Sequence, residues 1–112
     1  MGGGRSAHKI METMTAKDVI RQVASMYDVT VKQVMSRSRT NTLADCRTVI
    51  CHTLCKTYGM GYSDVGRIIH RSHADVIHHV DKGNDWLIMP YLNKRGSRAI
   101  IAMQSGNRQG IV

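Results

Sequence analysis

The segment YSDVGRIIHRSHADVIHHVDK, residues 62–82, decides the fold. Apolar side chains at three- and four-residue spacing predict a short helix over residues 62–69. Ser72 is a typical helix N-cap residue, and Asp75 stands at the third position of the helix that would follow it. Residues 70 and 71 leave room only for a tight connection. Two helices joined in this way predict a helix-turn-helix.

Upstream of this segment the sequence predicts three more helices. Thr15 begins a Thr-x-x-Asp capping pattern, and Thr30 can cap a short second helix. Thr42 begins another such pattern, at the start of a central core helix that ends before Gly59. Strictly alternating strand patterns are scarce, and proline occurs only at Pro90. We therefore expect an all-α fold of four to five helices.

The two ends differ in composition from this helical middle. Residues 1–14 contain a run of glycines and predict a flexible segment. The helical domain is expected over residues 15–88. Residues 89–112 carry lysines and arginines with scattered Gly and Ser, and predict a basic flexible tail in which only residues 99–103 could form a short helix.

The charge of the chain favours a polyanionic partner. Sixteen Lys and Arg stand against eight Asp and Glu, a formal net charge of +8 in 112 residues. Neutralising phosphates releases condensed counterions and so favours binding regardless of sequence. No apolar stretch is long enough to cross a bilayer or to act as a secretory signal, so we expect an intracellular protein with no membrane partner. No G-x-x-x-x-G-K-[ST] motif is present, so no nucleotide is expected.

The cysteines and histidines do not form a pattern typical of a catalytic or metal site. The three cysteines fall within one predicted helix, where they cannot form a disulfide framework, and we expect reduced thiols. His52 and Cys55 are the only close pair at helical ligand spacing. His78 and His79 diverge by about 100° on a helix and cannot easily share an ion. We expect no metal, no cofactor and no enzymatic activity.

Several features together resemble a known family. They are Val29-Thr30-Val31, the basic loop Ser36-Arg37-Ser38-Arg39, a central helix with Arg47, and the segment from Tyr62 to His78. The end of that segment is similar to the signature Gly-Arg-Asp-His-Thr-Thr-Val-x-His of the C-terminal DNA-binding domain, domain IV, of the bacterial replication initiator DnaA. The resemblance covers residues 18–87. It implies a helical domain of the Trp-repressor type that reads a short box of duplex DNA.

The resemblance also implies which residues meet the DNA. In that family the recognition helix enters the major groove, and an arginine of the basic loop enters the minor groove. The loop arginine would be Arg39, beside Arg37. A guanidinium on a polar loop suits the negative potential of a narrow, A·T-rich minor groove, although such loop arginines are often merely solvated. The major-groove positions would be Arg71, Ser72, His73 and Ala74.

Two departures from the family signature matter for DNA contact. Ser72 replaces its Asp, and Asp75 replaces its second Thr. A carboxylate beside phosphates is unfavourable unless Asp75 turns back onto the Ser72 amide. Alternatively, Asp75 accepts from a cytosine amino group, and the recognised sequence then differs from the family's box. His78 and Lys82 lie further along the same face, suited to a base edge and a phosphate, with Arg47 as a further phosphate contact.

The sequence thus predicts a monomeric, sequence-specific binder of double-stranded DNA that regulates replication or transcription in the bacterial cytoplasm or nucleoid, with a phage or mobile element as one source. The alternative is a protein-interaction module on the same fold, with Asp75 as a sign that the DNA face has changed. Steep weakening of binding with salt would favour the first interpretation. Single-stranded or RNA partners are less favoured because the chain has no Phe and few other aromatic residues for stacking.

Overall fold

The computed structural model describes residues 14–111, with side chains described as far as residue 104. Residues 1–13, most of the segment expected to be flexible, lie outside the described residues. All regular structure in the described part is helical, which confirms the all-α prediction. The six α-helices are α2 (Ala16–Met26), α3 (Val31–Met35), α4 (Asn41–His52), α5 (Tyr62–Ile69), α6 (His73–Ile88) and α7 (Lys94–Ile111). A π-helical turn, η1 (Thr53–Thr57), extends α4.

Threonine hydroxyls cap the N-termini of helices α2, α3 and α4. Thr15 and Thr30 cap α2 and α3 as predicted, each accepting the main-chain N–H of the third helical residue. The cap of α4 is Thr40 rather than Thr42, and its hydroxyl accepts from the amide of Leu43 over 3.2 Å. The extended backbone ends at Thr40, so α4 begins two residues earlier than predicted. The last loop residue before this cap is Arg39.

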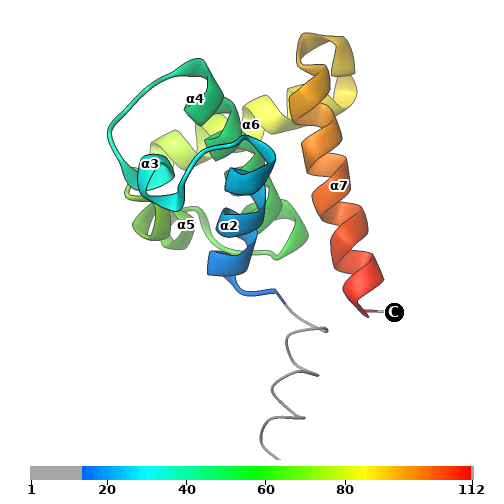
Figure 1. Ribbon diagram of the computed structural model, residues 1–112, viewed down its shortest axis with the longest axis horizontal. Helices are drawn as coiled ribbons and strands as arrows, with labels where there is room; N and C mark the ends of the chain where they lie inside the picture. Colours follow the sequence, from blue (N-terminus) through cyan, green and yellow to red (C-terminus); the bar gives the residue numbers. More distant parts are fainter. Residues whose placement is uncertain (1–13, 112) are drawn as a thin grey trace, which may run out of the picture.

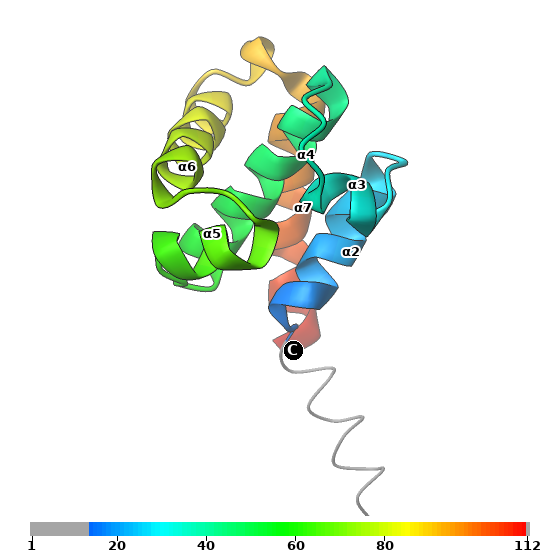
Figure 2. The same ribbon diagram turned by 90° about the vertical axis from the view of Figure 1, so that its left-hand side faces the viewer.

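Helix α4 is the centre of the molecule. It contacts α2, α3, α6 and α7, and Figures 1 and 2 show these helices arranged around it. Every residue from Cys46 to His52 is buried. The core is aliphatic, and its largest fully buried side chains are Ile20, Ile50, Leu54, Ile69, Ile100 and Met103. Burial of these side chains supplies most of the stabilisation of the fold.

Helices α5 and α6 form the predicted helix-turn-helix. The turn begins at His70, which adopts the left-handed conformation with φ 60°. The amide of Arg71 then donates to the carbonyl of Gly66 over 2.8 Å. A Cβ atom at Gly66 would collide with the Arg71 carbonyl, so the chain can turn this tightly only because residue 66 has no side chain.

The segment after residue 88 is not the flexible tail that its composition suggested. A 3-10 turn, η2, spans Pro90–Leu92, and α7 follows it. One side of α7 packs into the core through its buried residues Ser97, Ala99, Ile100 and Met103. Lys94, Arg95 and Arg98, the cations of this segment whose side chains are described, are exposed. The structure therefore has a helix over residues 94–111, where the sequence predicted a flexible tail.

Two side chains join the start of α7 to α4 and to the end of α2. Asn93 accepts the Gly96 amide over 2.8 Å and donates to the Asp45 carboxylate over 3.1 Å, so it caps α7 and joins it to α4. Arg95 donates to the carbonyl of Met26 over 2.9 Å, and its guanidinium lies 4.4 Å from the centre of the Tyr27 ring. The end of α2 and the start of α7 are therefore held together by a hydrogen bond and a cation–π contact.

Replacing Gly66 by alanine should destabilise the domain by about 1–3 kcal/mol, measured by urea denaturation. Alanine gains about 1 kcal/mol of helix propensity, but its Cβ would meet main chain that cannot move aside without opening the turn. Ser63→Ala, at an exposed position of the same helix, should change stability by less than about 0.5 kcal/mol. Equal stability of the two variants would show that the turn relaxes freely.

Candidate nucleic-acid interface

Arg47 organises the basic loop between α3 and α4. Its Nε donates to the Val34 carbonyl over 3.0 Å, and its Nη1 donates to the Ser38 carbonyl over 2.7 Å. Its Nη2 donates to the carbonyls of Gln33 and Ser36 over 3.2 and 2.9 Å. One guanidinium from the central helix therefore binds both the end of α3 and the loop that follows it. Along the chain, Arg37 and Arg39 alternate with Ser36 and Ser38, whose carbonyls Arg47 binds.

The burial of Arg47 gives it a role other than the phosphate contact expected from the sequence. The residue is only 2% exposed. Burial lowers the pKa of its guanidinium, and the positive charge of Arg71 lowers that pKa further. A buried cation is tolerated only when hydrogen-bonded, and four carbonyls supply that here. We therefore assign Arg47 to the positioning of the loop.

Arg71 joins this loop to the helix-turn-helix. Its Nη2 donates to the Ser36 carbonyl over 2.7 Å, and its Nη1 donates to the carbonyl of His70 over 3.1 Å. The Ser36 carbonyl thus accepts from both Arg47 and Arg71. The connection brings together two segments that are distant in the sequence.

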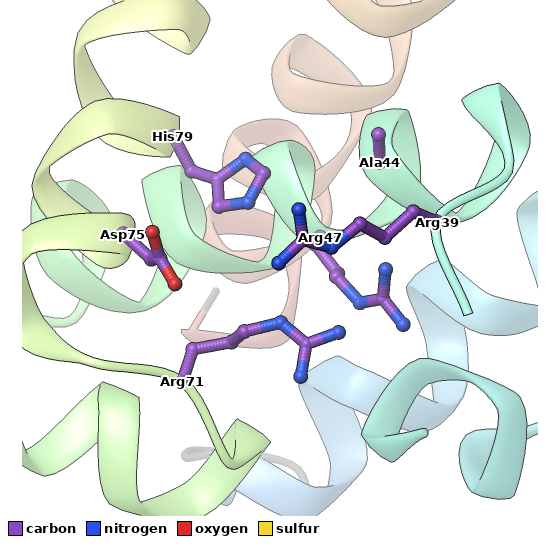
Figure 3. A pocket seen from close by; sticks show the side chains of 6 residues that line it. All are labelled: Arg39, Ala44, Arg47, Arg71, Asp75 and His79. Carbon is purple, nitrogen blue, oxygen red and sulfur yellow. The ribbon is translucent and has the colours of Figure 1, made fainter. Parts of the chain in front are cut away.

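A cavity of about 190 Å³ lies where these segments meet. Figure 3 shows the guanidinium groups of Arg39 and Arg71 directed into this space, with Asp75 and His79 of α6 on the opposite side. The guanidinium of Arg47 points toward the loop carbonyls that it binds. The residues that line the cavity are Arg39, Ala44, Arg47, Arg71, Asp75 and His79. A second hollow beside it also includes Arg37, His70 and Ser72. Three cations around one carboxylate leave a surplus of positive charge that favours an anionic partner.

The start of α6 presents its side chains to solvent. Ser72 caps the helix as predicted, its hydroxyl accepting the Asp75 amide over 3.2 Å. His73, Ala74 and Asp75 are exposed. Within the described part of the chain, the Asp75 carboxylate does not return to the Ser72 amide, so the reciprocal half of the capping box is not formed. Asp75 instead faces the arginine cavity.

The remaining predicted residues lie further along α6. His78 is exposed and Lys82 is half-buried, and neither lines the two hollows. Sequence reasoning missed two residues that line the first cavity, Ala44 and His79. His79 was considered only as a metal ligand. Its position four residues after Asp75, one helical turn away, is the signal that could have placed it beside Asp75.

His79 is held by the central helix. Its Nδ1 and the Thr48 hydroxyl share a hydrogen bond of 2.7 Å. Thr48 is fully buried, so this bond satisfies a hydroxyl that water cannot reach. Burial lowers the pKa of His79 to about 4, and the nearby charges of Lys82 and His78 act in the same direction. His79 is therefore neutral at pH 7 and adds no charge to the cavity.

The fold and the positively charged surface around the arginine cavity define a class of protein, the DNA-binding helix-turn-helix domains. The family is given by a comparison with family models, in which the bacterial dnaA protein helix-turn-helix model matches residues 16–82. The match covers more than half of the chain, and the chain belongs to this family. A search of curated proteins finds no match. Membership indicates DNA binding and a non-enzymatic role.

Two further observations concern the membrane partner and the metal that the sequence did not lead us to expect. None of the described helices combines the length and the apolar character that crossing a membrane requires. Among the described residues, no three His, Cys, Asp or Glu side chains gather into a group that could hold a metal ion.

Arg47→Lys should destabilise the domain by about 1–3 kcal/mol in urea denaturation, because an ammonium cannot serve four carbonyls arranged around a planar guanidinium. Arg37→Lys is the matched control at an exposed loop position and should shift stability by less than about 0.5 kcal/mol. If lysine at position 47 were as well tolerated as lysine at position 37, the main-chain contacts of Arg47 would carry little energy.

Acid should weaken the domain through His79. Below pH 6.5 the unfolded chain protonates this histidine, whereas the folded chain does not until about pH 4. Stability is therefore complete above pH 6.5 and falls between pH 6.5 and 4. Thermal melts of wild type and His79→Gln should show a smaller loss over this range in the variant. Parallel losses would assign the acid sensitivity to other groups, such as buried His52, whose pKa is also lowered by burial.

Proposed function

We propose that this domain recognises a short sequence of duplex DNA, with the start of α6 in the major groove and Arg39 in the adjacent minor groove. The observation that carries the proposal is the cavity that Arg39 and the first turn of α6 line together. Two groups that must reach neighbouring grooves at the same time need a fixed separation. The bonds from Arg47 and Arg71 to the loop supply it.

The basic loop suits the minor groove. Arg37 and Arg39 are exposed. The main chain between them is held at the Ser38 carbonyl by Arg47, so little backbone entropy remains to be lost on binding. A narrow A·T-rich minor groove concentrates negative potential and attracts an inserted guanidinium. We propose Arg39 for this insertion and Arg37 for a flanking phosphate.

The start of α6 suits the major groove. The imidazole of His73 can donate or accept a hydrogen bond at a base edge, and the methyl of Ala74 can contact that of a thymine. The free amides of the first helical turn favour a phosphate near Ser72. Arg71 uses two of its guanidinium N–H groups within the protein, and the others remain for guanine or phosphate.

Asp75 would set the specificity of this domain apart from that of its family. Its exposed carboxylate stands near cations that offset its repulsion of phosphates. It can accept from the amino group of cytosine, a donor that thymine lacks. His78 would read a further base edge, and Lys82 would contact a phosphate. Binding at such a sequence would regulate replication or transcription there.

Selection of bound duplexes from a random pool tests this function. Wild type should enrich one motif, and Arg39→Ala and His73→Ala should each weaken binding to it about tenfold or more. Arg21→Ala removes an exposed arginine of α2 that lines neither of the two hollows, and it should leave affinity nearly unchanged. Asp75→Thr should shift the enriched motif at one base pair.

The salt dependence of binding tests the same proposal and includes the result that would refute it. Affinity for the selected duplex should fall steeply as salt rises, with a slope that Lys82→Ala reduces by about one. A pool without enrichment, or binding indifferent to salt and to Arg39, would refute sequence-specific recognition. That result would favour a protein-interaction module on the same fold.

A further inference from the structure

The corner between α6 and α7 exposes an unusual concentration of apolar side chains. Of the six large exposed apolar residues in the described part of the chain, four lie within residues 88–92. Ile88 is 74% exposed, Tyr91 71%, Leu92 52% and Met89 37%. Residues 88–92, here named the apolar corner, lie beyond the family match, which ends at residue 82. The family therefore does not account for them.

The apolar corner is ordered by its own hydrogen bonds. The Leu92 amide donates to the Met89 carbonyl over 3.0 Å, and the Tyr91 hydroxyl donates to the Met89 sulfur over 3.3 Å. Beneath it, buried Trp86 packs against Gly96, where any Cβ would collide with the indole ring. Exposed apolar side chains gathered in one short ordered segment are typical of an interface, because little entropy is lost when a partner covers them.

The charges around the corner indicate what covers it. Residues 86–93 carry no charge. The last charged residue before them is the exposed acid Asp85 of α6, and the first charged residue after them is the exposed cation Lys94 at the start of α7. If a two-fold axis passes between these two flanks, Asp85 of each copy faces Lys94 of the other. The surface then complements itself, as an isologous contact requires.

We propose that the apolar corner is the interface of a symmetric homodimer of this chain. The interface leaves the DNA-reading ends free, because α6 has 16 residues and the corner lies about 24 Å along it from Ser72. Figure 1 shows the corner at the opposite end of α6 from α3 and α5. Such a dimer carries two reading heads and suits a pair of half-sites. The sequence had favoured a monomer, because charge and motif patterns do not show which apolar residues remain uncovered.

Sedimentation equilibrium without DNA tests the dimer directly. Wild type should change from monomer to dimer as its concentration rises, and Tyr91→Glu and Leu92→Glu should each raise the dimer dissociation constant about tenfold or more. Ile101→Glu places the same charge on a half-exposed residue of α7 outside the corner and should leave dimerisation unchanged. A monomeric wild type, or a dimer that both corner variants retain, would overturn the proposal. Far-UV circular dichroism confirms that each variant is folded.

A charge exchange distinguishes pairing between copies from loss of folding. Asp85→Lys alone and Lys94→Asp alone should each weaken the homodimer, because like charges then face each other across the axis. A mixture of the two variants should form the heterodimer, since opposite charges are restored at both contacts. No recovery in the mixture would contradict this arrangement. Because the measurement needs no DNA, its outcome is independent of whether the domain recognises a specific duplex.

Discussion

The arrangement of this domain depends on the guanidinium of Arg47. The carbonyl groups at the end of a helix and in the loop after it have no partners within regular secondary structure. A loop that exposes two arginines therefore needs donors from elsewhere in the fold for its carbonyls. From inside the central helix, Arg47 donates to two carbonyls at the end of α3 and to two in the loop. Because a planar guanidinium fixes the directions of its donors, the same contacts that stabilise the loop also determine its path. The display of Arg37 and Arg39 follows from a residue that is itself buried.

Helix α6 is positioned against the same central helix. Thr48 bonds to His79 near the middle of α6, and His52 bonds to Asn84 over 2.8 Å one turn further on. Gly83 lies between these contacts, and a Cβ there would come within 2.8 Å of the His52 ring. The helices can therefore approach closely enough for both polar bonds to form. The basic loop and α6 share α4 as a common support, which keeps their separation constant.

Around the arginine cavity, the attraction of phosphates is balanced against the repulsion between the arginines themselves. Three arginines around one cavity attract phosphates, but they also repel one another. Neutral His79 adds nothing to that repulsion, and the Asp75 carboxylate relieves part of it. Carbonyl contacts to Arg47 and Arg71 relieve more, because main-chain dipoles point their negative ends at the cations. The surplus that remains is positive, as DNA binding requires.

The sequence by itself determined the elements and the class of protein. Spacing of apolar residues and threonine or serine caps located five helices, and residues 62–82 predicted the helix-turn-helix, because these are local properties of the chain. Tertiary structure decided the rest. Arg47 became a buried support rather than a phosphate contact, His79 entered the cavity, and α7 proved to be packed against the core. In each case the deciding partners, such as Ser36 for Arg47, Thr48 for His79 and Asp45 for Asn93, stand many residues away, and a local pattern contains no information about contacts made across the fold.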